Sequence, residues 1–265
     1  MDVIKSKDNS KIKYVRSLNN KKNRETDFVV EGYKLVEEAI YEMTEKSEIK
    51  FILISESEAN KNEFYGFADI LKSKEIDYYL CDNKVFNSVA DTINSQGILA
   101  VAAKKVYNKE DILTDNKFII MCDRIQDPGN LGTIIRTADA FGPAAVILNK
   151  GCADIYNPKV VRAAAGALFR VPFITGDAGN EIISYLKNTG YKIISAVVDS
   201  NYSFNDIEKS EKICVVIGNE GQGVSQEILD YSDLKITIKM TGRLESLNAS
   251  IAAGISIYEI RKKLL

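Results

Sequence analysis

The 265-residue chain contains no histidine and no tryptophan, and it has only four cysteines. Without histidine, neither a Ser-His-Asp nor a Cys-His triad can form, and no imidazole can act as a general base. The cysteines, at positions 81, 122, 152 and 214, are too scattered to suggest a metal site, so we expect no metal. Chemistry must therefore depend on Asp, Glu, Lys, Arg or Tyr side chains, or on a cofactor.

The chain also lacks long apolar runs. None approaches the roughly 20 residues needed to cross a bilayer, so we expect no membrane partner. The first 24 residues are charged and contain no apolar segment of the kind found in secretory signals. Apolar residues make up 45% of the chain, which is typical of globular proteins with a full core. The expected location is the cytoplasm, with the thiols reduced.

Charge is unevenly distributed along the chain. The net charge is −2, but residues 1–24 carry +6 and the remaining residues carry −8. A basic arm on an acidic body favours contact with phosphates, although a solvated, partly helical tail explains the same run equally well. The candidate RNA-contacting residues in this arm are Lys11, Lys13, Arg16, Lys21, Lys22 and Arg24.

Two α/β patterns follow one another. Residues 1–105 form the first predicted domain, residues 106–116 are polar and predict a linker, and residues 117–265 form the second domain. The second domain alternates apolar strands with helical segments, which predicts a mostly parallel sheet covered by helices on both faces. Its expected strands are 118–122, 145–148, 192–198, 213–217 and 234–238, and its expected helices are 130–141, 158–169, 180–188, 225–231 and 247–264.

The first domain reads as a small α/β sandwich. Helical spacing is found at 32–45, 63–72 and 85–89, and the apolar runs at 51–54, 78–81 and 98–103 predict strands. This half of the chain contains no phosphate-binding loop and no cluster of residues typical of catalysis.

Three segments of the second domain place small or amide-bearing residues between a strand and a helix, where open α/β sheets bind ligands. They are residues 130–136 (Asn-Leu-Gly-Thr-Ile-Ile-Arg), 217–223 (Ile-Gly-Asn-Glu-Gly-Gln-Gly) and 245–248 (Glu-Ser-Leu-Asn). Asn130 and Ser246 are candidate helix caps. Glu220, in a tight loop between glycines, is expected to have a specific partner. A purely structural role for Asn130, and an ion pair of Arg136 with Asp139, are alternatives to a functional role.

Together, these three segments resemble the signature motifs of the SpoU (TrmH) family of RNA 2′-O-ribose methyltransferases, within the SPOUT superfamily. The resemblance covers residues 117–265 and implies a deep trefoil knot, which general topology rules disfavour. Residues 28–40 and 94–100 resemble the substrate-binding domain of ribosomal-RNA members, which is similar to the L30e fold. The resemblance also implies a homodimer formed through the second domain.

The resemblance implies S-adenosylmethionine as cofactor and a ribose 2′-hydroxyl as methyl acceptor. The catalytic residues that match the motifs are Asn130, Arg136, Glu220, Ser246 and Asn248. The cofactor would be bound by Gly218, Asn219, Glu220, Gly221, Ile238, Met240 and Leu247. A guanidinium stays protonated in proteins, so Arg136 is expected to bind a phosphate or the developing alkoxide rather than act as a base.

The expected substrate is 23S-type ribosomal RNA, because of the separate first domain, and Arg162 is a further candidate for contacting it. Surface ion pairing explains Arg162 and Arg170 equally well. A tRNA ribose methyltransferase is the nearest alternative. A non-catalytic RNA-binding or ribosome-assembly protein, and an ordinary nucleotide-binding enzyme, are alternatives from other classes. The glycine spacing matches neither a dinucleotide fingerprint nor a P-loop.

Overall fold

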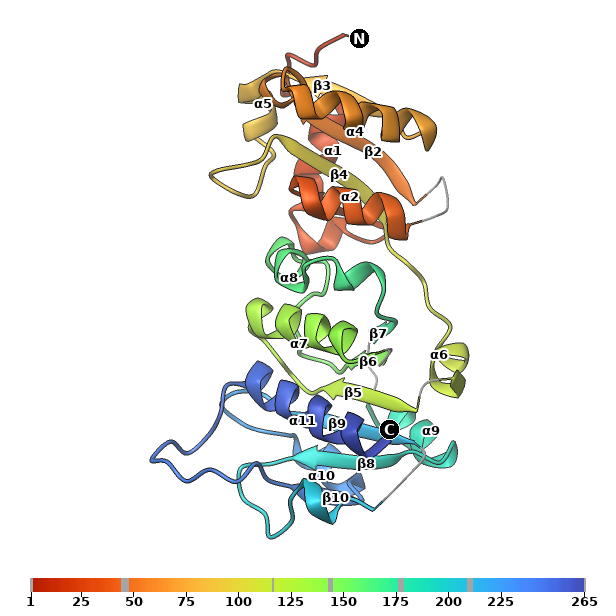
Figure 1. Ribbon diagram of the computed structural model, residues 1–265, viewed down its shortest axis with the longest axis vertical. Coiled ribbons are helices and arrows are strands. Elements are labelled where there is room, and N and C mark those ends of the chain that lie inside the picture. The colour runs from red at the N-terminus through yellow and green to blue at the C-terminus, as the bar shows by residue number, and fades with distance from the viewer. Residues whose placement is uncertain are drawn as a thin grey trace. The chain divides into compact units, whose positions relative to one another are not determined.

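The computed structural model describes residues 2–43, 48–115, 117–142, 145–175, 179–208 and 212–264 (Figure 1). The chain divides into two compact units. Unit 1 contains Met1–Val106 and Tyr156–Phe169, and unit 2 contains Tyr107–Ile155 and Arg170–Leu265. Among the described residues, no helix is long and apolar enough to cross a membrane.

Unit 1 is built on a four-stranded mixed sheet in the order β1-β4-β2-β3. β1 and β2 pair antiparallel with β4, and β3 pairs parallel with β2. The strands are β1 (Asp27–Glu31), β2 (Ile49–Ser55), β3 (Tyr78–Cys81) and β4 (Ile98–Ala103). The helices are α1 (Ser10–Leu18), η1 (Lys21–Asn23), α2 (Tyr33–Glu42), α3 (Glu56–Ala59), α4 (Asn62–Ser73), α5 (Asn83–Asn87), α8 (Pro158–Ala164) and η2 (Ala167–Phe169).

The two faces of this sheet are covered by different helices. α1 and α5 bury Ile12, Val15 and Phe86 against strand residues such as Leu53 and Leu99. α2 contacts β1 and β4 on the opposite face, and α8 also contacts β1. The predicted α/β sandwich is therefore present, with a helix contributed by a distant part of the chain.

Sequence patterns did not predict β1, and they gave α1 only as part of the alternative of a partly helical tail. β1 is fully buried but begins with Asp27 and ends with Glu31, so its charged ends conceal a strand. Glu31 is tolerated there because its carboxylate accepts hydrogen bonds from the backbone N–H groups of Asp91, at 2.7 Å, and Thr92, at 3.3 Å. The helix expected at 32–45 is observed as α2 and has ended by Met43; residues 44 and 45 lie outside the described residues.

Unit 2 is a six-stranded sheet in the order β10-β8-β9-β5-β6-β7, and every neighbouring pair of strands is parallel. The predicted fold class, a mostly parallel α/β sheet, is thus confirmed. The strands are β5 (Phe118–Cys122), β6 (Ala145–Leu148), β7 (Phe173–Thr175), β8 (Lys192–Ala196), β9 (Ile213–Ile217) and β10 (Leu234–Ile236). The helices are α6 (Lys109–Asp115), α7 (Pro128–Ala140), α9 (Gly179–Asn188), α10 (Gln226–Tyr231) and α11 (Ala249–Leu264), with the short η3 (Phe204–Asp206).

Helices cover both faces of the parallel sheet. α6, α9 and α10 contribute Leu113, Leu186 and Ile228 to a core with Met121 and Val216. α7 and α11 pack against each other, α7 contacts β6 and α11 contacts β9. Along each strand, successive side chains point alternately toward one helical layer and the other, as the two-residue period of a strand requires.

Two segments differ from the sequence-based division of the chain. Residues 106–116 were expected to be a linker, but α6 within them buries Ile112 and Leu113 in the core of unit 2. Residues 156–169 were expected in the second domain, with 158–169 as one helix, yet they belong to unit 1. That helix ends early, because Ala165 and Gly166 both have positive φ angles, and η2 follows. Threading of the C-terminal segment through a knot stays a prediction.

Candidate active site

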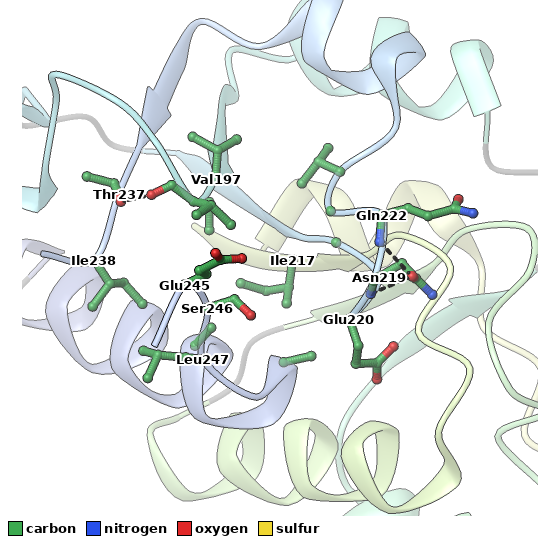
Figure 2. A pocket seen from close by; sticks show the side chains of 18 of the residues that line it. Val197, Ile217, Asn219, Glu220, Gln222, Thr237, Ile238, Glu245, Ser246 and Leu247 are labelled. Atoms are coloured by element: carbon green, nitrogen blue, oxygen red, sulfur yellow. Dashed lines mark hydrogen bonds between the residues drawn. The ribbon is translucent and has the colours of Figure 1, made fainter. Parts of the chain in front are cut away.

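A pocket of about 460 Å³ lies at the carboxyl ends of β8, β9 and β10, the three adjacent strands on one side of the unit 2 sheet (Figure 2). This is the edge where open parallel sheets bind ligands, and the volume lies within the usual range for small-molecule sites. Three stretches line most of it: 196–198 after β8, 217–224 after β9, and residues between 237 and 252 after β10.

All seven residues predicted to bind the cofactor line this pocket, together with Ser246. The pocket also has apolar walls that the sequence analysis did not identify, made by Ala196, Val197 and Ala252. For Ala196 and Val197 the only signal was their position at the end of a buried parallel strand, which faces the ligand edge, whereas Ala252 lies in the first turn of α11. Thr237 and Glu245 likewise line the pocket and were not predicted.

The glycine-rich loop after β9 closes tightly on itself. Asn219 and Gly223 exchange two backbone hydrogen bonds, of 3.1 and 2.9 Å. Gly223 has a φ of +67°, and a Cβ placed on Gly218 would lie 2.2 Å from the carbonyl carbon of Gly223. Only glycine fits at position 218, because the returning backbone occupies the space of a side chain. Gly221 carries no such constraint, since the nearest atom to its added Cβ lies 3.6 Å away.

The side chain of Asn219 holds this loop rather than facing a ligand. Its Oδ1 accepts hydrogen bonds from the N–H groups of Gly221, at 2.9 Å, and Gln222, at 3.0 Å (Figure 2). Its Nδ2 donates to the carbonyl oxygen of Arg124, at 2.9 Å. Asn219 therefore links the second motif to the segment that follows β5.

Arg124 completes this link and was not predicted. Its guanidinium donates to Oε1 of Gln222, at 2.8 Å, and to the carbonyl oxygen of Gly223, at 3.1 Å. Arg124 has a φ of +58°, a conformation that is uncommon outside glycine and that turns the chain sharply after β5. The clue in the sequence was a charged pair, Asp123 and Arg124, directly after a buried strand.

Asp123 is completely buried at the end of β5. Its carboxylate accepts hydrogen bonds from Nδ2 of Asn149, at 2.9 Å, and from the N–H of Ser225, at 2.7 Å. These partners follow β6 and β9, so one carboxylate joins the ends of three neighbouring strands. A buried charge is tolerated only when it is paired in this way.

A chain of side-chain hydrogen bonds connects the three motifs. Nδ2 of Asn248 donates to Oδ1 of Asn130, at 2.9 Å, and Nδ2 of Asn130 donates to Oε1 of Glu220, at 2.7 Å. Asn130 thus uses both ends of its amide, and the partner expected for Glu220 is identified. Asn130 and Asn248 do not line the pocket themselves, but this chain leads directly to Glu220, which does.

The helix caps differ from those predicted. Asp127, rather than Asn130, caps α7 by accepting the N–H of Asn130 at 2.7 Å. At α11, Oδ1 of Asn248 accepts the N–H groups of Ser250, at 2.9 Å, and Ile251, at 3.3 Å, so Asn248 takes the place expected for Ser246. Asp127 and Asn248 are also residue types favoured at helix N-caps, so the observed first turn of each helix, and not the residue type, identifies the cap.

Arg136 is exposed on α7 and makes no hydrogen bond or ion pair with any residue in the described part of the chain. The alternative pairing of Arg136 with Asp139 is wrong. Asp139 instead receives a bidentate contact from Arg170, with Nη2 at 2.8 Å from Oδ2 and Nε at 3.0 Å. Arg136 is therefore available to a ligand, although it does not line the pocket.

The basic residues of unit 1 are placed in three ways. Lys13, Arg16, Lys21 and Lys22 are exposed. Lys11 is half-buried, with Nζ 4.2 Å from the ring centroid of Tyr79. Arg24 departs from the expectation of an RNA contact. It is 5% exposed, and its Nη1 donates to the carbonyl oxygen of Leu18, at 3.2 Å, at the end of α1. In this structure its role is to stabilise the turn after that helix.

Arg162 forms an ion pair with Asp91 in unit 1, with Nη1 2.5 Å from Oδ2, and about a third of its side chain is exposed. The ion-pair alternative therefore describes Arg162 and Arg170 in this structure. Within the described ranges, no group of three or more Cys, Asp or Glu side chains is arranged to hold a metal ion.

Comparison with known proteins supports these observations for both halves of the chain. Residues 117–258 match the SpoU rRNA Methylase family, and residues 9–100 match the MRM3-like substrate binding domain. A relative from Bacillus subtilis (strain 168), the 23S rRNA (guanosine(2553)-2'-O)-methyltransferase RlmP, is 34% identical over 263 residues, covering 98% of this chain and all of the relative.

Solved structures show the same fold. An AdoMet-bound rRNA methyltransferase from Sinorhizobium meliloti superposes with a TM-score of 0.84 at 26% identity, covering 100% of this chain and 98% of that one. The SpoU methyltransferase AviRb from Streptomyces viridochromogenes, at 23% identity, shares the fold with a TM-score of 0.82, covering 96% and 98% of the two chains. The chain therefore belongs to the SpoU rRNA methylase family and is an RNA 2′-O-methyltransferase, as its three motifs indicate.

Proposed function

We propose that this enzyme transfers a methyl group from S-adenosylmethionine to a ribose 2′-hydroxyl of large-subunit ribosomal RNA. The observation that carries the proposal is that the second and third motifs line one pocket, and that the hydrogen-bond chain from Asn248 through Asn130 to Glu220 joins the first motif to it. The pocket supplies a place for the cofactor, and the exposed Arg136 supplies a cation for the RNA.

The residues of the pocket fit this cofactor. Apolar side chains such as Val197, Ile217 and Leu247 suit the faces of an adenine ring, and backbone groups of the loops can meet its polar edges. The absence of a Cβ at Gly218 keeps the loop compact beside the ligand. When bound, S-adenosylmethionine supplies a methyl group activated by a sulfonium centre.

The protein must orient the ribose oxygen and stabilise the charge that develops on it. Arg136 is the candidate for the second task, because its guanidinium is exposed and has no partner in the described part of the protein. A guanidinium keeps its proton, so its role is electrostatic rather than that of a base. Asn130, Glu220, Ser246 and Asn248 position the loops around the reacting groups.

Ribosomal RNA is the substrate that the observations favour. The relative with 34% identity over nearly the whole chain acts on 23S rRNA, and residues 9–100 match a substrate binding domain. Within unit 1, the exposed residues Lys13, Arg16, Lys21 and Lys22 offer contacts to phosphates. Such a substrate agrees with the cytoplasmic location expected from the sequence.

We also propose a homodimer formed through α7 and α11. These neighbouring helices leave Ile251 and Tyr258 about half exposed, and Tyr258 packs edge-on against the exposed Phe141, with ring centroids 5.7 Å apart. Exposed apolar side chains gathered in this way are typical of an interface. Sedimentation of the wild type as a dimer, and of Ile251→Glu with Tyr258→Glu as a monomer, would support this interface.

The activity is tested by transfer of labelled methyl from S-adenosylmethionine to total rRNA and, separately, to total tRNA. Wild-type enzyme should label rRNA and make one linkage resistant to alkaline cleavage. Arg136→Lys should lose most of the transfer, because an ammonium lacks the planar fork of a guanidinium. Arg170→Lys, which keeps a cation beside Asp139, is the matched control and should stay active.

Label found only in tRNA would overturn the rRNA substrate. Full turnover by Arg136→Lys would refute the proposed role of the guanidinium. If the protein binds the cofactor but transfers no methyl group to mature RNA, the assay is repeated with rRNA from isolated ribosomal precursors. Transfer to the precursor rRNA would indicate an assembly-stage substrate, and no transfer would indicate a non-catalytic protein.

A further inference from the structure

The pocket of unit 2 has an unusual balance of charge. Twenty of the described residues line it, and Glu220 and Glu245 are the only charged ones among them. Most small-molecule sites for nucleotides with phosphates offer cations or helix N-termini to the anion. A lining with two carboxylates and no basic side chain instead favours a ligand that carries positive charge.

The two carboxylates differ in how they are engaged. Glu220 accepts a hydrogen bond from Asn130, at 2.7 Å, and is turned toward α7 in Figure 2. Glu245 makes no hydrogen bond or ion pair with any described residue, and its side chain is seen among those that line the pocket (Figure 2). Glu245 is therefore the carboxylate that is free to meet a ligand.

The surroundings of Glu245 strengthen this assignment. The neighbouring walls are apolar side chains, including Val197, Ile217 and Leu247, which cannot neutralise a carboxylate. Glu245 is exposed and has no partner among the described residues, so its carboxylate is accessible to a cationic ligand seated against these walls. No basic residue of the lining competes for that position.

We propose that Glu245 recognises the cofactor by its positive charge and so sets the preference of the pocket for a charged adenosine derivative. This inference rests on the proposed function, because it takes S-adenosylmethionine as the ligand. That molecule carries two cationic centres, the sulfonium and the α-ammonium group. 5′-Methylthioadenosine has the same adenosine and a neutral sulfur, but neither cation.

The test compares the binding of these two ligands to the full chain by calorimetry. Glu245→Gln should weaken S-adenosylmethionine binding by about fivefold, the upper range for an exposed charge pair, and leave 5′-methylthioadenosine binding unchanged. Glu245→Asp, which keeps the charge, should recover most of the affinity. Glu227→Gln is the matched control, since Glu227 is exposed on α10 and lies outside the pocket lining.

Binding of S-adenosylhomocysteine, which keeps the ammonium group and loses the sulfonium, locates the contact. If Glu245→Gln lowers the affinity for S-adenosylmethionine and S-adenosylhomocysteine equally, Glu245 contacts the ammonium group. If it lowers the affinity for S-adenosylmethionine alone, Glu245 contacts the sulfonium. Unchanged S-adenosylmethionine binding by Glu245→Gln, or an equal loss for 5′-methylthioadenosine, would overturn the inference. Failure of the wild type to bind S-adenosylmethionine would instead refute the proposed function.

Discussion

At the scale of single residues, the site depends on amide and carboxylate side chains that hold one another. Asn130 illustrates this, because it donates to Glu220 and accepts from Asn248. A short amide can do both at once, which a carboxylate cannot. The identity of Asn130 is therefore fixed by its two partners rather than by helix capping, which Asp127 performs.

We expect Asn130→Asp to lower the rate of methyl transfer by about tenfold or more, equivalent to ~1.4 kcal/mol of activation barrier. The substitution is isosteric, but it removes the donor to Glu220 and places two carboxylates face to face. The affinity for S-adenosylmethionine should change little, since Asn130 does not line the pocket. Single-turnover kinetics and calorimetry measure the two effects. Asn188→Asp, at the exposed end of α9, is the control; an equal loss there would indicate a general effect of charge.

The buried thiols predict how stability depends on pH. Burial raises the pKa of Cys152 from its ordinary value of 9.0 to about 11, and also raises that of Cys122 and Cys214. Above pH 9 the unfolded chain releases protons that the folded chain retains, so the free energy of unfolding should fall as the pH rises toward 11. Urea unfolding at several pH values measures this fall. Cys152→Ala should make it shallower, and an unchanged slope would contradict the assignment.

At the scale of elements, the loop after β9 is the part of the site with the strictest steric demand. Gly218→Ala should force the loop open, because its Cβ would overlap the backbone of Gly223 and Val224. We expect a loss of about 1–3 kcal/mol in the free energy of unfolding and weaker cofactor binding. Gly221→Ala, in the same loop, would bring its Cβ no closer than 3.6 Å to its nearest neighbour, Oδ1 of Asn219, and should change stability by less than ~0.5 kcal/mol. Equal stability of the two variants would show that the loop adapts.

Element positions were well predicted where patterns were regular. β5, β6 and β9 match the expected strands because each is a short apolar run buried on both faces. α6 and β1 were missed for the opposite reason. In α6, polar residues outnumber the buried Ile112 and Leu113, and in β1, charged residues flank the buried ones. The burial of these residues becomes visible only from the residues that pack against them in the structure.

At the scale of the whole molecule, each unit has its own task. Unit 2 holds the pocket that we propose for the cofactor, and unit 1 matches a substrate binding domain and carries the basic α1 region. Replacing Lys13, Lys21 and Lys22 with Gln should weaken RNA binding and reduce the salt dependence of log K by roughly 2. Cofactor affinity should remain the same. Gln replacements at Lys50, Lys72 and Lys74, which are also exposed in unit 1, provide the control. An equal effect of the control would indicate non-specific attraction by charge.

The sequence by itself determined the class of fold and the three motifs, because strand periodicity and loop composition are local properties. The seven residues predicted to bind the cofactor came from the resemblance of those motifs to a known family, and all seven line the pocket. The tertiary structure decided which side chains meet. Glu220 lies 90 residues from Asn130, and Asn248 lies 118 residues from it, yet all three join in one chain of hydrogen bonds. Arg124, Asp123 and Glu245 became functional candidates only when the ends of parallel strands came together, since that proximity depends on the pairing order of the sheet rather than on any local pattern.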